Sequence, residues 1–122
     1  GCRMSQIWDN HSIKEAVFHP RALETIREFP DEIRREIGKV IWDLQKGSQL
    51  GPPAAKLMRV VGAGVEELRL RDRTGAYRAF YLARLADRVL IFHAFVKKSP
   101  KTPQKEIDTG RKRLREMLDE TP

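Results

Sequence analysis

Residues 66–95 read EELRLR (66–71), DRTG (72–75), AYRAFYLARL (76–85), ADR (86–88) and VLIFHAF (89–95), and this stretch decides the fold. Its first segment alternates apolar and charged residues, which is the period-two pattern of a half-buried strand. The two later apolar segments are rich in aromatic and β-branched residues and are separated by short polar breaks typical of hairpins. Gly75 can adopt a positive φ in the first turn. The stretch therefore predicts three consecutive antiparallel strands, a meander.

The segments on either side of the meander predict helices. Residues 21–28 and 31–46 carry apolar residues at helical spacing and predict an αα-hairpin, in which Asp31 can cap the free amides of the second helix. A last helix is predicted for residues 103–118, with Thr102 as its N-cap and Pro103 in its first position. The apolar stripe predicted for this helix consists of Ile107, Leu114 and Leu118.

The rest of the chain predicts little regular structure. Residues 12–18 predict a short strand, and residues 51–64 an irregular connection that ends in a flexible Gly-Ala-Gly hinge. Together the segments predict an α+β fold: a small antiparallel sheet with an N-terminal αα-hairpin and a C-terminal helix packed on it.

The composition predicts one basic domain. The chain has 122 residues, and the domain is predicted to span residues 4–122, because Gly1-Cys2-Arg3 before Met4 look like an expression remnant. The net charge of +7 favours an anionic partner: RNA, DNA or an acidic protein. Cys2 is the only cysteine, so no internal disulfide can form. With no apolar run near the ~20 residues of a membrane span and no signal peptide, a cytoplasmic protein without membrane contact is expected.

Standard catalytic motifs are absent from the sequence. It has no P-loop, no dinucleotide-binding glycine pattern and no HExxH, and its three histidines lie in no metal-ligand spacing. No serine or cysteine lies in a nucleophile elbow. We therefore predict neither a metal nor a cofactor. What remains is a cationic set with aromatic residues interleaved: Arg69, Arg71, Arg78, Lys97 and Lys98, with Tyr77, Tyr81 and His93.

This cationic set suits RNA cleavage. Arginine can hold a phosphate by two parallel hydrogen bonds, and tyrosine can stack on a splayed base. A phosphodiester attacked by its own 2′-hydroxyl develops charge on its non-bridging oxygens, which fixed guanidinium groups stabilise without a metal. A lysine crowded by other cations can act as a base near neutral pH. Arg78 is expected to be held most firmly because it lies in the central strand, whereas Lys97 and Lys98 are expected on a connection.

Three segments together resemble the RelE/ParE toxin superfamily: ELR (67–69), YRAFY (77–81) and HAFVKKSPKTP (93–103). The resemblance is greatest to the HigB-like, phage-derived branch, and it covers residues 13–118, including the order of the elements. It implies a RelE-like fold and the toxin role of a type II toxin–antitoxin pair.

The resemblance also implies an activity and a site. In the mRNA-cleaving members, cationic residues on the middle strands and after the last strand surround the scissile phosphate. By strand position these match Arg69, Arg71, Arg78, Lys97 and Lys98. The implied activity is that of a metal-independent, ribosome-dependent mRNA endoribonuclease that inhibits translation.

The remaining implied roles concern the acid, the RNA and the partners. Some members use a tyrosine or histidine near the last strand as the acid; the final helix here has no tyrosine, which leaves Tyr81 or His93. Arg73, Tyr77 and Lys101 are expected to contact RNA. The implied partners are the ribosome, mRNA and a cognate helix-turn-helix antitoxin, through which alone the toxin would reach operator DNA.

Other interpretations of the same residues stay open. Arg69 and Arg71 could form a solvated strand face, and the lysines after the last strand could simply aid solubility. At least one of Tyr77 and Tyr81 is better suited to the core, and His93 in an apolar strand is typical of a satisfied core histidine. Two other functions also fit: a gyrase inhibitor on the same fold without the catalytic set, and a non-enzymatic module whose basic face binds only an acidic partner.

Overall fold

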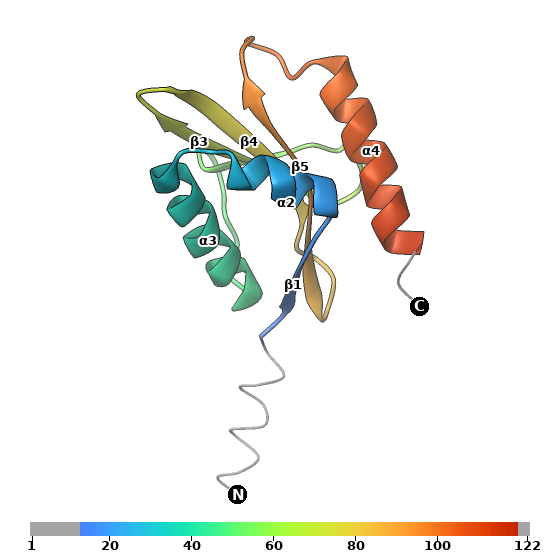
Figure 1. Ribbon diagram of the computed structural model, residues 1–122. Coiled ribbons are helices and arrows are strands. Elements are labelled where there is room, and N and C mark those ends of the chain that lie inside the picture. Colours follow the sequence, from blue (N-terminus) through green and yellow to red (C-terminus); the bar gives the residue numbers. More distant parts are fainter. Residues whose placement is uncertain (1–12, 120–122) are drawn as a thin grey trace, which may run out of the picture.

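The computed structural model describes residues 13–119, which form a sheet with helices on both faces (Figure 1). The α+β class predicted from the sequence is confirmed. The strands are β1 (Glu15–Phe18), β2 (Ala55–Leu57), β3 (Val65–Asp72), β4 (Gly75–Leu82) and β5 (Arg88–Lys97). The helices are α2 (Pro20–Arg27), α3 (Asp31–Gln45) and α4 (Gln104–Asp119). No helix within residues 13–119 combines the length and hydrophobicity needed to cross a bilayer. The predicted remnant at Gly1–Arg3 lies outside the described residues.

The predicted meander is confirmed as β3, β4 and β5, each antiparallel to the next. In the turn between β3 and β4, Oδ1 of Asp72 accepts hydrogen bonds from the backbone N–H groups of Thr74, at 2.8 Å, and Gly75, at 3.2 Å. Gly75 has the expected positive φ, 154°. The last strand is longer than predicted: β5 continues to Lys97, so this lysine lies in the sheet and not on a connection.

The two edge strands complete a sheet of order β1-β5-β4-β3-β2. β1 pairs in parallel with β5, so the sheet is mixed and only its other pairings are antiparallel. The short strand predicted for residues 12–18 is confirmed over Glu15–Phe18, and its first residue, Ser12, lies outside the described residues. The prediction of an irregular connection was wrong at Ala55–Leu57, because these residues pair with β3 as β2.

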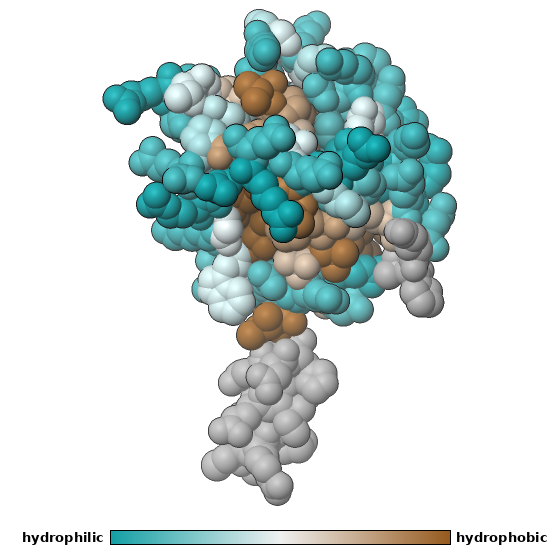
Figure 2. Space-filling model, in the orientation of Figure 1, coloured by the Kyte–Doolittle hydropathy of each residue, from teal (hydrophilic) through white to brown (hydrophobic). Residues whose placement is uncertain are grey.

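Helices α2 and α3 form the predicted αα-hairpin and cover one face of the sheet (Figure 1). Leu68 and Leu70 are buried against them, while Arg69 and Arg71 are exposed, as the alternation predicts. The predicted cap at Asp31 was wrong: this residue lies in the first turn of α3 and pairs with Arg34. The buried stripe of α3 consists of Ile33, Ile37, Ile41 and Leu44. Figure 2 shows that the outward surfaces of these helices are mostly hydrophilic, with hydrophobic residues visible between them.

Helix α4 covers the opposite face of the sheet, and its N-terminal cap and its buried stripe differ from the prediction. Thr102 is not its N-cap, because the Thr102 hydroxyl donates to Glu67, and the carbonyl of Pro103 accepts the first helical hydrogen bonds instead. Leu118 is 39% exposed, and Met117 takes its expected place in the core. The residues that α4 buries are Ile107, Gly110, Leu114 and Met117.

At Gly110, α4 packs closely against Phe80 of the sheet, which provides a test of this packing. A Cβ atom there would lie 2.7 Å from Cδ2 of Phe80 and 3.3 Å from Cγ1 of Val61, whereas one at Gly38 in α3 would meet nothing within 4 Å. We expect Gly110→Ala to lower the free energy of unfolding by about 1–3 kcal/mol through overpacking. Gly38→Ala, the matched control, should raise it by about 0.5–1 kcal/mol.

Guanidinium chloride denaturation followed by circular dichroism measures both changes. Equal stabilisation by the two substitutions would contradict the close packing of α4 on Phe80.

Candidate active site

Strand register gathers the predicted cations on the face of the sheet that α4 covers in part. Residues directly opposite one another in paired strands share a face. Arg69 of β3 lies opposite Arg78 of β4, and Arg71 lies opposite Ala76, which on its other side faces Lys97 of β5. The small side chain of Ala76 leaves space between Arg71 and Lys97. These four cations, with Lys56 of β2, are called the cationic face below.

Lys97 reaches the cationic face because β5 contains a β-bulge. Phe80 pairs with His93, but the next residue of β4 pairs with Ile91, so Phe92 has no partner there. The rings of Phe92 and His93 both pack near that of Phe80, with centroids 6.2 and 5.6 Å away. The extra residue reverses the alternation of every side chain beyond it. Without the bulge, Lys97 would point toward the face that α2 and α3 cover.

Arg78 lies buried at the base of the cationic face, with 6% of its surface exposed. Its Nη1 atom donates to the carbonyl of Tyr77 at 3.0 Å and to that of Leu70 at 3.4 Å. Its Nε atom lies 3.8 Å from Oε1 of Glu67, an ion pair that is longer than a hydrogen bond. Burial lowers the pKa of Arg78, and the charge of Glu67 opposes that shift. The guanidinium is therefore held firmly, as its central strand predicts, but it is withdrawn from solvent.

Lys97 is half-buried among the other cations. Partial burial is the main cause that lowers the pKa of Lys97, and the charges of Arg78, Arg69 and Lys56 add to the effect, while Glu67 opposes it. A lowered pKa increases the fraction of neutral amine near pH 7, and a neutral amine can accept a proton. Lys97 is thus the member of the cationic face best suited to act as a base.

Two members of this site were missed from the sequence, Glu67 and Lys56. They lie opposite one another on β3 and β2, and the Glu67 side chain is fully buried, with 1% exposed. The sequence did indicate on which face Glu67 lies, since Glu67, Arg69 and Arg71 are alternate residues of one predicted strand. No such indication existed for Lys56, because the strand that contains it was not predicted.

The other predicted cations surround the cationic face. Arg73 is exposed in the turn between β3 and β4, next to Arg71. Lys98 and Lys101 are exposed on the connection between Lys97 and α4, where the Ser99 hydroxyl donates to the carbonyl of Lys101 at 2.7 Å. The turn and this connection follow paired ends of neighbouring strands, so these cations extend the charged surface at one end of the sheet.

Tyr77 and Tyr81 do not join the cations. Both side chains point to the opposite face, where α2 and α3 cover them to 6% and 2% exposure. The ring of Tyr77 packs on Phe29 at 4.8 Å, and its hydroxyl is hydrogen-bonded to that of Thr74. Burial raises the pKa of Tyr81, and the charge of Glu66 adds to this. We withdraw Tyr81 as an acid and Tyr77 as a base-stacking residue, because a strand directs neighbouring residues to opposite faces.

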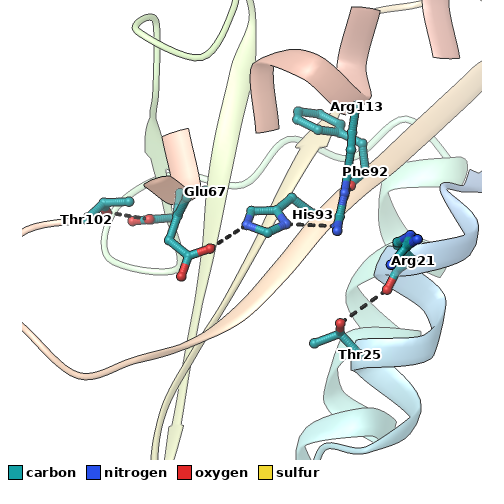
Figure 3. A network of polar contacts seen from close by, with 8 residues as sticks. Arg21, Thr25, Glu67, Phe92, His93, Thr102 and Arg113 are labelled. Carbon is teal, nitrogen blue, oxygen red and sulfur yellow. Dashed lines mark hydrogen bonds and ion pairs between the residues drawn. The ribbon is translucent and has the colours of Figure 1, made fainter. Parts of the chain in front are cut away.

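His93 lies on the same face as the cations, because it is paired with Phe80 of β4, but α4 covers it. Figure 3 shows its ring between Arg113 and a carboxylate group. Its Nδ1 atom is 2.9 Å from Nη1 of Arg113, and its Nε2 atom is 2.8 Å from Oε1 of Glu106. A guanidinium only donates, so Nδ1 accepts and Nε2 carries the proton. Burial lowers the pKa of His93, which is 6% exposed. We therefore withdraw His93 as the acid. Both ring nitrogens have partners, so His93 fits the alternative interpretation of a satisfied core histidine.

A wide surface hollow lies away from the cationic face. It has a volume of about 1050 Å³ and is bounded by β1, the start of α2 and the end of α4. Val17 and Met117 give it an apolar part, and charges of both signs line the rest, including Arg21 and Glu116. Within residues 13–119, no group of three or more His, Cys, Asp or Glu side chains is placed to hold a metal ion.

Residues 24–115 match the family model described as phage-derived protein Gp49-like (DUF891). The chain belongs to the Gp49-like family. Because this is a RelE-like toxin family, membership of the RelE/ParE superfamily is confirmed. A search of curated protein sequences finds no significant match.

Two solved structures of similar fold support the architecture of this Gp49-like chain. One is the free state of an arginine-to-alanine double mutant of the Escherichia coli toxin RelE, at 18% identity and a TM-score of 0.59, covering 87% of this chain and 99% of that one. The other is a chain of the intact E. coli RelBE toxin–antitoxin complex, at 18% identity and a TM-score of 0.50, covering 70% and 99%. At this identity the likeness establishes the RelE-like fold alone.

The buried His93 makes the stability of the Gp49-like chain depend on pH. In the unfolded chain a histidine has a pKa of ~6.5, and burial lowers the pKa of His93 in the folded state. As pH decreases through about 6.5, His93 therefore gains a proton in the unfolded state while it is still neutral in the folded state, so the free energy of unfolding falls. We expect His93→Gln, whose amide can accept from Arg113 and donate to Glu106, to lose part of this pH dependence.

Urea denaturation of both proteins at pH 7.5 and 5.5 measures the difference. If the two proteins lose the same stability between these pH values, His93 is not the titrating group.

Proposed function

We propose that this chain is the toxin of a type II toxin–antitoxin pair of the HigB-like branch and acts as a metal-independent endoribonuclease on ribosome-bound mRNA. One observation carries the proposal: three neighbouring strands place Arg69, Arg71, Arg78 and Lys97 on a single face. Directly opposed like charges destabilise paired strands, so a sheet that keeps Arg69 against Arg78 favours a polyanionic ligand.

The proposed reaction is attack by the 2′-hydroxyl of a nucleotide on its own 3′-phosphate. It forms a 2′,3′-cyclic phosphate and breaks the P–O5′ bond, and the leaving 5′-oxygen of the next nucleotide takes a proton from solvent water. Lys97 in its neutral form takes the proton of the 2′-hydroxyl, since its pKa is lowered by partial burial and by the cations around it. The exposed Arg69 and Arg71 hold the phosphate by paired hydrogen bonds. Arg78 supports the negative charge that develops on the non-bridging oxygens from a fixed position, which avoids reorganisation during the reaction.

The exposed cations beside the cationic face bind the rest of the RNA in this proposal. Arg73, Lys98 and Lys101 carry charge to the same end of the sheet. Phosphate contacts of this kind position a nucleic acid without reading its sequence. They also make binding weaker as salt increases.

The proposed partners follow from the charge and from the similarity to the RelBE complex. We propose a cognate helix-turn-helix antitoxin whose toxin-binding segment is acidic, because a net charge of +7 favours an anionic partner. The toxin would reach operator DNA only through that antitoxin. Because the proposed substrate is ribosome-bound mRNA, we place the activity in the cytoplasm.

Lys97→Arg tests the proposed base. Arginine keeps the positive charge but is not deprotonated in proteins, so we expect cleavage of mRNA on programmed ribosomes to slow by about a hundredfold or more. RNA binding should change by only a few-fold, because the charge is kept. Lys39→Arg, at an exposed position of α3 outside the cationic face, is the matched control and should cleave at close to the wild-type rate.

Wild-type cleavage by Lys97→Arg would remove Lys97 as the base.

Pulse labelling separates the proposed target from DNA gyrase. When the toxin is expressed without an antitoxin, methionine incorporation should fall before thymidine incorporation, because translation is the proposed target. The reverse order, together with gyrase-linked DNA breaks, would favour the gyrase inhibitor instead. Growth arrest without either pattern, and without RNA cleavage, would favour a module that only binds an acidic partner.

A further inference from the structure

Glu67 is an acid at the centre of a group of cations. Among the residues that the structure describes, it is the only acidic side chain that is fully buried, with 1% exposed. It lies in β3 directly opposite Lys56 of β2 on one side and Phe80 of β4 on the other. Burying a carboxylate is costly unless it is paired and hydrogen-bonded. The surroundings of Glu67 therefore need to compensate its charge.

The two carboxylate oxygens of Glu67 have different partners. Oε2 accepts a hydrogen bond from the hydroxyl of Thr102 at 2.9 Å (Figure 3). Oε1 lies 3.8 Å from Nε of Arg78 and pairs with it electrostatically. Thr102 precedes α4 and follows the lysine-containing connection from β5. A single side chain thus links β3, β4 and the start of the last helix around Lys97.

We propose that Glu67 is a positioning residue of the candidate active site: its buried carboxylate anchors Arg78 and Thr102 and sets the electrostatic environment in which Lys97 works. The inference rests on the proposed role of Lys97 as the base. It assigns Glu67 no contact with the substrate.

Glu67 acts on Lys97 together with several cations. The groups that act on Lys97 are Lys56 from β2, Glu67 and Arg69 from β3, and Arg78 from β4. Glu67 is the only anion among them and opposes the three cations. Loss of its charge should lower the pKa of Lys97 further, so the amine would become neutral at a lower pH.

Two substitutions separate the charge of Glu67 from its hydrogen bond. Glu67→Gln removes the charge and keeps an oxygen that can accept from Thr102. Thr102→Val removes the hydrogen bond and keeps the charge. Titration of Lys97 is followed by NMR at its Cε atom in protein that contains ¹³C-labelled lysine, and the Lys97 signal is identified by its absence from Lys97→Arg. We expect Glu67→Gln to lower the titration midpoint of Lys97 by about one pH unit, and Thr102→Val to leave it unchanged.

A second background protects the test against misfolding. Glu67→Gln leaves the buried guanidinium of Arg78 without its counter-ion, which can prevent folding. The double variant Glu67→Gln/Arg78→Met removes both buried charges together, and its Lys97 midpoint should lie below that of Arg78→Met alone, whose fold is checked by circular dichroism. An unchanged midpoint in both backgrounds, or an equal fall in Thr102→Val, would overturn the proposal.

The same variants in the cleavage assay distinguish this inference from the proposed function. If Glu67 positions the base, the pH of half-maximal cleavage should fall in Glu67→Gln with the NMR midpoint, a change that a merely structural role would not produce. A fall in the NMR midpoint without cleavage by any variant, wild type included, would overturn the proposed function and retain the electrostatic role of Glu67. A fall in the NMR midpoint with an unshifted cleavage profile would overturn the link to Lys97 as the base.

Discussion

The β-bulge at Phe92 and His93 is the constraint on which both the α4 core and the candidate active site depend. It places two consecutive rings of β5 against Phe80, and α4 packs on this aromatic cluster. The same extra residue reverses the alternation beyond it, so Lys97 reaches the face that carries Arg78. One irregularity of the backbone therefore orients both the aromatic rings under α4 and the proposed base, Lys97. A change that removed the bulge would affect the packing of α4 and the candidate active site together.

The cationic face keeps its charges through one buried anion. Arg69 and Arg78 lie opposite one another, an arrangement that costs stability, and Arg78 is in addition largely removed from water. Glu67 offsets part of that cost and at the same time fixes the start of the segment leading into α4 through Thr102. Locally unfavourable arrangements of this kind are typical of functional sites, because the site is organised for a ligand that the free protein lacks.

Much of the fold and part of the site could be predicted from local pattern. Leu68 and Leu70 alternate with Arg69 and Arg71, and that alternation alone assigned their faces correctly. The same rule was available for Tyr77 and Tyr81, which differ in parity from Arg78, and applying it would have excluded both from the cationic face. The edge strands were harder, since β1 and β2 are too short to show a period and nothing local specifies that β1 pairs in parallel with β5.

The sequence by itself determined the meander, the helices, the excess of basic residues and the resemblance to the RelE/ParE superfamily, because alternation, helical spacing and motifs are properties of neighbouring residues. The tertiary structure alone decided that Lys97 joins the arginines, that Arg78 is buried, and that Glu67 and Lys56 belong to the site. It also decided that His93 serves the core under α4. Each of these depends on strand register, a bulge or burial, which arise from contacts between residues far apart in the chain and leave no local pattern.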